Sequence, residues 1–267
     1  MRIIDVMGMR LPFLAAGDGP RAPVGAAFGG AGSVFFVHGA GGNGGQWQAQ
    51  LDGLPPGWRG LALDLPGHGA SAGAGRRAIA EYRDVVVACL RAAAAAPAVL
   101  VGHSMGGAIA QAVALAEPDV LRGLVLVGTG ARLRVHPSIF EALRQDPVEA
   151  ARLLLDWGFA AAAPPGLRDE GARDLLRCPA QVIEGDFRAC DGFDVMAEVG
   201  RIRVPSLIVC GEQDALTPPK YARFLHQRIP GSRLALVPDA GHYVMRERPA
   251  AVNAALGEFL AGLRLEG

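Results

Sequence analysis

The sequence has almost no lysine and no concentration of positive charge. Lys220 is the single lysine among 26 basic residues, so arginine carries nearly all of the positive charge. The 26 acidic residues balance these to a formal net charge of zero, and the basic residues form no stripe along the chain. Because nucleic-acid-binding surfaces are strongly basic, we do not expect nucleic acid to be a partner.

Paired cysteines and long apolar runs are also missing. None of the four cysteines belongs to a C-x-x-C pair, a pattern typical of reduced thiols in a cytoplasmic protein, although one bond between Cys178 and Cys190 stays open. No apolar run of about 18 residues is free of charge, so no membrane-spanning helix is expected. Residues 1–5 reach an acid before an apolar segment can form, so we expect no signal peptide.

What the chain does have is apolar runs that alternate with helical stretches. It is 51% hydrophobic and 19% charged, which predicts a folded protein with a sizeable core. Short apolar runs separated by helices predict an α/β fold with a mainly parallel sheet. Strands are expected at 3–6, 11–15, 33–37, 61–65, 98–101, 123–128, 206–210 and 233–237. Helices are expected at about 46–54, 81–96, 108–116, 220–228 and 249–263.

This alternation stops between residues 131 and 195. Short helices are expected there, and only residues 181–183 offer a weak strand signal. A helical insert in such a chain is typical of a cap over one end of the sheet. We therefore predict a core domain of residues 1–130 and 196–267 and a helical cap (lid) of residues 131–195.

A candidate nucleophile follows the strand at 98–101. Gly102-His103-Ser104-Met105-Gly106 has the form G-x-S-x-G and leads directly into a helix. Such a turn is tight, and glycines let the backbones approach. The turn pushes the serine outward, beside the free amides of the new helix, where a developing negative charge can be held. The alternative is an ordinary glycine-rich turn with a solvated serine.

Asp214 and His242 complete a possible catalytic triad. They follow the last two predicted strands, so they should meet Ser104 at the carboxyl edge of the sheet. The order Ser, Asp, His is that of α/β-hydrolases. His242 would take the serine proton, and Asp214 would hold the imidazole tautomer. The other five histidines lie in glycine-rich turns, beside the serine, in the insert or in a helix.

An oxyanion hole needs two backbone donors. The amide of Met105 is one candidate, and the amide of Ala40, in the loop after the strand at 33–37, is the other. We also expect Trp47, Trp157, Phe159 and Tyr243 to shape the substrate pocket. Plain core packing is the alternative for the two tryptophans and the phenylalanine.

The loop that contains Ala40 also supports a second interpretation. Gly39, Gly41 and Gly44 spell G-x-G-x-x-G between a strand and a helix, and Asp64 ends the next strand, as in a dinucleotide-binding oxidoreductase. We rank this second because it leaves the Ser, Asp and His series unexplained, and Asp64 then becomes a carboxylate that accepts turn amides. No P-loop or H-x-x-x-H pattern is present, so neither that phosphate site nor a metal site is predicted.

In these motifs the chain resembles the α/β-hydrolase superfamily, and within it the small cap-bearing serine esterases of the carboxylesterase type. The matching segments are 38–41 (HGAG), 64–69 (DLPGHG), 102–107 (GHSMGG), 211–214 (GEQD) and 241–242 (GH). The resemblance implies an eight-stranded, mostly parallel sheet with an antiparallel second strand and flanking helices. It also implies a helical cap inserted after strand six, and no cofactor.

The resemblance leaves the branch open between carboxylesterases, enol-lactonases, pimeloyl-ester hydrolases and C–C bond hydrolases. Ser104 argues against the branches that use an aspartate nucleophile. The expected function is hydrolysis of carboxylic esters of small to medium acyl chain through an acyl-enzyme, with an enol-lactone or C–C bond hydrolase as the alternative. The expected partners are a small-molecule ester and water, and the expected state is a monomer or small homo-oligomer.

Overall fold

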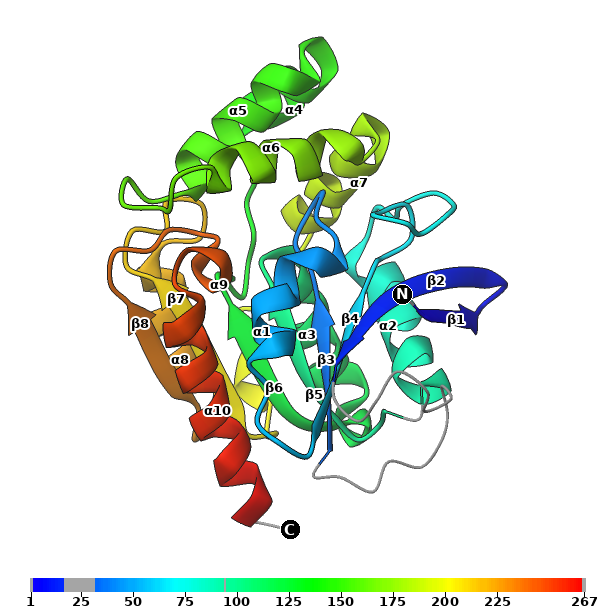
Figure 1. The fold of residues 1–267 in the computed structure, drawn as a ribbon, viewed down its shortest axis with the longest axis vertical. Coiled ribbons are helices and arrows are strands. Elements are labelled where there is room, and N and C mark those ends of the chain that lie inside the picture. Colours follow the sequence, from blue (N-terminus) through cyan, green and yellow to red (C-terminus); the bar gives the residue numbers. More distant parts are fainter. Residues whose placement is uncertain (1, 17–31, 94, 266–267) are drawn as a thin grey trace.

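The computed structural model describes residues 2–16, 32–93 and 95–265; the rest of the predicted core domain lies outside these ranges. Eight strands form one sheet in the order β1-β2-β4-β3-β5-β6-β7-β8 (Figure 1). The second strand is antiparallel to both of its neighbours, and the ladders from β4 to β8 are parallel. The predicted sheet is therefore confirmed. The strands are β1 (Arg2–Val6), β2 (Met9–Ala16), β3 (Gly32–Val37), β4 (Trp58–Leu63), β5 (Ala98–His103), β6 (Leu121–Val127), β7 (Ser206–Gly211) and β8 (Arg233–Val237).

Both faces of the sheet are covered by helices, which is why the central strands read as continuous apolar runs. Successive side chains of a strand point to opposite faces. Phe35 accordingly packs in the layer that contains α2, α3 and α8, whereas Phe36 packs in the layer that contains α1, α9 and α10. The helices of the first layer are α2 (Ile79–Ala92), α3 (Met105–Ala116) and α8 (Pro219–Arg228). Those of the second are α1 (Gln48–Asp52), α9 (Val244–Glu247) and α10 (Pro249–Leu265).

Four more helices lie between β6 and β7 and gather at one end of the sheet (Figure 1). They belong to residues 131–195, called the helical insert below. Together they bury a small apolar core of their own, formed by residues such as Ile139, Leu154 and Ile183. The helices are α4 (Pro137–Gln145), α5 (Pro147–Gly158), α6 (Leu167–Arg177) and α7 (Ala180–Asp191).

Some predicted details were wrong. Residues 181–183 belong to α7, because Val182 and Ile183 form part of an apolar helix face rather than a strand. The segment at 46–54 is split between the 3₁₀ helix η1 (Gly44–Trp47) and α1, and α2 ends at Ala92 rather than at residue 96. Two further 3₁₀ turns are η2 (Pro118–Val120) and η3 (Val199–Arg201). All four cysteines are free, so Cys178 and Cys190 form no disulfide bond.

Candidate active site

Ser104 occupies a strained turn between β5 and α3. Its backbone has φ 53° and ψ −115°, a conformation that non-glycine residues rarely adopt. A Cβ atom at Gly102 would collide with the carbonyl oxygen of Gly106, and one at Gly106 would collide with that of Val37. The glycines of the motif are therefore needed because the backbones are in close contact. The Ser104 amide donates to the Val127 carbonyl at 3.0 Å, which ties the turn to β6.

His242 and Asp214 form the hydrogen bond expected of a base and its orienting acid. His242 Nδ1 lies 2.9 Å from Asp214 Oδ2 and 3.2 Å from Oδ1, and both residues are buried. The amides of Leu216 and Thr217 donate to Asp214 Oδ1 at 2.9 and 2.8 Å, and the Thr217 hydroxyl donates to Oδ2 at 2.8 Å. A carboxylate that accepts all of these bonds favours a proton on Nδ1, which leaves Nε2 free to accept one.

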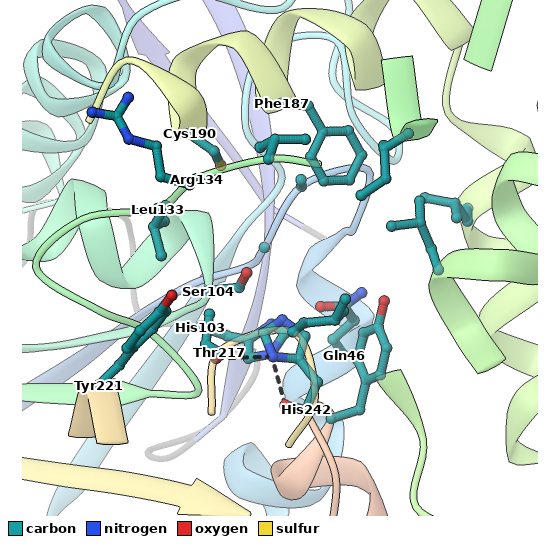
Figure 2. Close-up of a pocket in the computed structure, with 18 residues that line it drawn as sticks. Gln46, His103, Ser104, Leu133, Arg134, Phe187, Cys190, Thr217, Tyr221 and His242 are labelled. Atoms are coloured by element: carbon teal, nitrogen blue, oxygen red, sulfur yellow. Dashed lines mark hydrogen bonds between the residues drawn. The ribbon is translucent and has the colours of Figure 1, made fainter. Parts of the chain in front are cut away.

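Ser104 and His242 line the same pocket (Figure 2). Within the described part of the chain, no hydrogen bond joins the Ser104 hydroxyl to His242. Such bonds are often long in unliganded sites and shorten when substrate binds. The fold thus brings the three residues predicted from sequence to one edge of the sheet.

The loop after β3 contains the candidate donor Ala40. The Gly42 amide donates to the Gly39 carbonyl at 3.1 Å, which closes a four-residue turn. Gly41, the third residue of this turn, has φ +63°, which favours glycine. A side chain there would also collide with Leu175 of α6. The turn therefore lies directly beneath the helical insert.

His38 fixes the orientation of the Ala40 peptide. Its Nε2 accepts from the Leu65 amide at 3.1 Å, so Nδ1 carries the proton and donates to the Gly39 carbonyl at 2.8 Å. Burial and the nearby His68 lower the pKa of His38, which keeps the ring neutral. The Gly39 carbonyl and the Ala40 N–H belong to one planar peptide. Holding the carbonyl therefore sets the direction of the N–H.

Asp64 is occupied by loop amides, as the sequence suggested. One of its oxygens accepts from Gly44 at 2.7 Å and the other from Ala70 at 2.9 Å. The carboxylate is thus engaged in supporting two turns, whereas the dinucleotide interpretation would need it for a ribose. Among the residues that the structure describes, no group of three or more His, Cys, Asp or Glu side chains could hold a metal ion.

The pocket above Ser104 is largely apolar. It encloses about 770 Å³ of space, including its opening to solvent. Much of its wall comes from the helical insert: Leu133, Val135, Ile139, Leu154, Leu175 and Phe187. The amide of Gln46 and the hydroxyl-bearing side chains of Thr217 and Tyr221 add polar groups near the serine (Figure 2).

The predicted aromatic residues separate into two groups. Tyr243 lines the pocket. Trp47, Trp157 and Phe159 do not, so their assignment to the pocket was wrong. Trp47 is fully buried beneath the sheet against Phe36, with ring centroids 5.2 Å apart. Trp157 is 39% exposed on α5, and Phe159 stacks on Tyr243 at 4.6 Å.

The sequence analysis did not predict two residues of the site. Thr217 lies three residues after Asp214 and closes a turn on it, so a D-x-x-T pattern was an available signal. Asp186, on α7, accepts from the loop that contains Ala40 but belongs to no motif. Its role became visible only in three dimensions.

The sequence model described as the alpha/beta hydrolase family matches residues 34–255. The chain belongs to the α/β hydrolase family. A pimeloyl-[acyl-carrier protein] methyl ester esterase of Neisseria meningitidis serogroup B is 30% identical over 243 residues, which is 86% of this chain and 93% of that protein.

Two solved structures show similar relationships. A thermophilic esterase is 36% identical with a TM-score of 0.83, covering 98% of this chain and 97% of its own. The enol-lactonase from Burkholderia xenovorans LB400 is 25% identical with a TM-score of 0.88, covering 97% of this chain and all of its own. In the described residues, no helix is both long and apolar enough to cross a membrane.

Proposed function

We propose that this α/β hydrolase is a serine esterase that cleaves carboxylic esters of small to medium acyl chain. The observation that carries the proposal is the bond between Asp214 and His242, with His242 and Ser104 lining one largely apolar pocket. The relatives above agree with it, since they include a methyl ester esterase and an enol-lactonase, and a lactone is a cyclic ester.

In this mechanism the Ser104 hydroxyl attacks the ester carbonyl while His242 Nε2 takes its proton. Asp214 stabilises the imidazolium that forms. The oxyanion of the tetrahedral intermediate accepts hydrogen bonds from the amides of Ala40 and Met105. His242 then returns the proton to the leaving alcohol, and an acyl-enzyme remains. Water that gives a proton to His242 attacks the acyl-enzyme, and His242 returns this proton to Ser104 Oγ as the bond to the acyl group breaks and the acid leaves.

The helical insert acts as the cap in this proposal, because its side chains supply much of the apolar wall. A pocket of this size and character suits an acyl chain without a charge close to the carbonyl. We propose a monomer or small homo-oligomer in the cytoplasm as its working form.

A chain-length series of nitrophenyl esters tests the proposal. Ser104→Ala should lower kcat by about 10³-fold or more, because the nucleophile is lost while binding is retained. Ser138→Ala is the matched control, since this serine contacts His136 at the surface of the insert. A rapid initial release of nitrophenol should reveal the acyl-enzyme. Hydrolysis by Ser104→Ala at the wild-type rate would refute the mechanism.

A further inference from the structure

A fully buried carboxylate of the helical insert lies against the loop after β3 that contains Ala40, called the oxyanion loop below. Asp186 on α7 is inaccessible to solvent, and its Oδ2 accepts from the Gly41 amide at 2.9 Å. The same oxygen lies 2.7 Å from His68 Nε2, and Oδ1 accepts from the Tyr82 hydroxyl at 2.6 Å. Three residues that are distant from α7 in sequence therefore converge on this one side chain.

His68 faces Asp186 as a cation. Its Nδ1 lies 3.0 Å from the Pro66 carbonyl, which can only accept, so both ring nitrogens carry protons. Burial by itself lowers the pKa of His68, but the hydrogen bond and charge of Asp186 outweigh it and raise the pKa to about 10. Neither side chain is exposed to solvent. A buried ion pair is costly to desolvate, so holding groups in one geometry is a better account of it than stability.

The pair of Asp186 and His68 fixes the geometry of the oxyanion loop. The Gly41 N–H belongs to the peptide that directly follows the Gly39–Ala40 peptide, and the two share the Ala40 Cα atom. Asp186 holds the second peptide and His38 holds the first. The rings of His38 and His68 also lie side by side, with centroids 4.8 Å apart. With both peptides held, the Ala40 N–H has little freedom to turn.

We propose that Asp186, held by His68 and Tyr82, is a positioning residue through which the helical insert orients the Ala40 amide toward the oxyanion. This inference rests on the proposed esterase function. It assigns to the insert a part in the chemistry of the ester carbonyl in addition to its part in the pocket wall. Asp186 itself touches no reacting atom and acts through the Gly41 peptide.

Three variants perturb this arrangement to different degrees. Asp186→Ala removes the bond to the Gly41 amide together with those to His68 and Tyr82. We expect kcat to fall by about 10- to 100-fold, less than the 10²- to 10³-fold cost of deleting an oxyanion donor. Asp186→Asn keeps the shape and one oxygen that can accept from Gly41. Its NH2 group cannot accept from the Tyr82 hydroxyl, and its neutral amide no longer pairs with the charge of His68, so a smaller fall is expected. Tyr82→Phe keeps the carboxylate and should have the smallest effect. Glu184→Gln is the control, because Glu184 is on the same helix and pairs with Arg188 at the surface.

The measurement separates orientation from folding. A fluorophosphonate that labels Ser104 counts the active sites in each preparation, so kcat is expressed per active site. A positioning role predicts lower kcat per site, with KM changed less than about twofold. It also predicts weaker inhibition by an alkyl trifluoromethyl ketone, in proportion to the loss in kcat/KM, since its adduct places an oxyanion in the hole. If Asp186→Ala does not fold, the Asn and Phe variants carry the same comparison.

The outcomes are distinct. Full kcat per site in the Asp186 variants, or a loss explained entirely by fewer active sites, would overturn the positioning role and leave the esterase proposal intact. Wild-type protein that neither hydrolyses esters nor labels at Ser104 would overturn both. A graded loss in the order Ala, Asn, Phe, with an unchanged Glu184→Gln control, is the result that we expect.

Discussion

The buried pair of His68 and Asp186 predicts a particular dependence of stability on pH. The pKa of His68 is about 10 in the folded protein, whereas an unperturbed histidine has a pKa near 6.5. The folded state therefore binds one more proton than the unfolded state between these values. The stabilisation that protonated His68 contributes is complete below about pH 6.5 and is lost as the pH rises toward 10.

The size of the effect follows from this difference in bound protons. Because the folded state binds one extra proton, the free energy of unfolding falls by about 1.4 kcal/mol for each unit by which the pH rises. Between pH 7.5 and 9.0 the loss should therefore be about 2 kcal/mol. The other ionisable groups that face His68 are His38, Tyr82 and Cys178. Burial and the charge of Asp186 raise the pKa of Tyr82, so this phenol stays protonated throughout the window.

Asp186→Asn removes the cause of the raised pKa. Burial, which remains, favours the neutral ring of His68, so this contribution to the slope should vanish above about pH 7. Reversible urea unfolding followed by circular dichroism at pH 7.5, 8.25 and 9.0 measures the free energy for both proteins. Groups that titrate equally in both cancel in the difference. The stability advantage of the wild type should therefore shrink by about 2 kcal/mol across this range.

Glu184→Gln controls for the loss of a carboxylate on α7, and its difference from the wild type should not change with pH. A difference between the wild type and Asp186→Asn that stays constant from pH 7.5 to 9.0 would show that His68 carries no extra proton in the folded state. The assignment of both ring protons, made from the contacts with Pro66 and Asp186, would then be wrong.

Two further predictions concern the turn at Ser104. Ser104→Gly should be about 1 kcal/mol more stable than Ser104→Ala, because glycine relieves roughly 1–3 kcal/mol of strain at φ 53° but costs about 0.5–1 kcal/mol in chain entropy. The midpoints of thermal unfolding should therefore differ by about 2–4 °C, and equal midpoints would argue against strain. Gly102→Ala should destabilise the protein by about 3 kcal/mol or more in urea unfolding, since its methyl group would meet the Gly106 backbone. Gly262→Ala, with open space at its Cβ in the exposed face of α10, should instead add about 0.5–1 kcal/mol; similar effects at both positions would contradict the close contact.

The sheet and the Ser104 turn were predictable because local sequence determines them. A strand buried on both faces is apolar over most of its length, as residues 34–37 of β3 are, and its ends are marked by glycine and polar residues. Parallel strands then bring their carboxyl ends to one edge. Ser104, Asp214 and His242 could be placed together on that basis without knowledge of any side-chain contact.

The positions of the aromatic side chains were not predictable, because they depend on which face of an element is turned inward. Trp47 follows the oxyanion loop by only a few residues, yet its ring packs beneath the sheet against Phe36. Phe159 stacks on the ring of Tyr243, which lines the pocket. Asp186 is 145 residues from its partner Gly41, and no local pattern indicates a contact of that range.

The helical insert also holds the loop of the proposed base. The His242 amide donates to the Gly158 carbonyl at 2.6 Å, and Glu247 accepts from both Gly241 and Ala160 at 3.0 Å. Asp186 of the insert thus accepts from the oxyanion loop. Glu247 of the core accepts from Ala160 of the insert and from Gly241, the residue before His242. Lifting the insert away as a rigid body would therefore break the supports of both loops at once. For this reason the positioning role proposed for Asp186 predicts that the insert affects the rate of the chemical step as well as the choice of substrate.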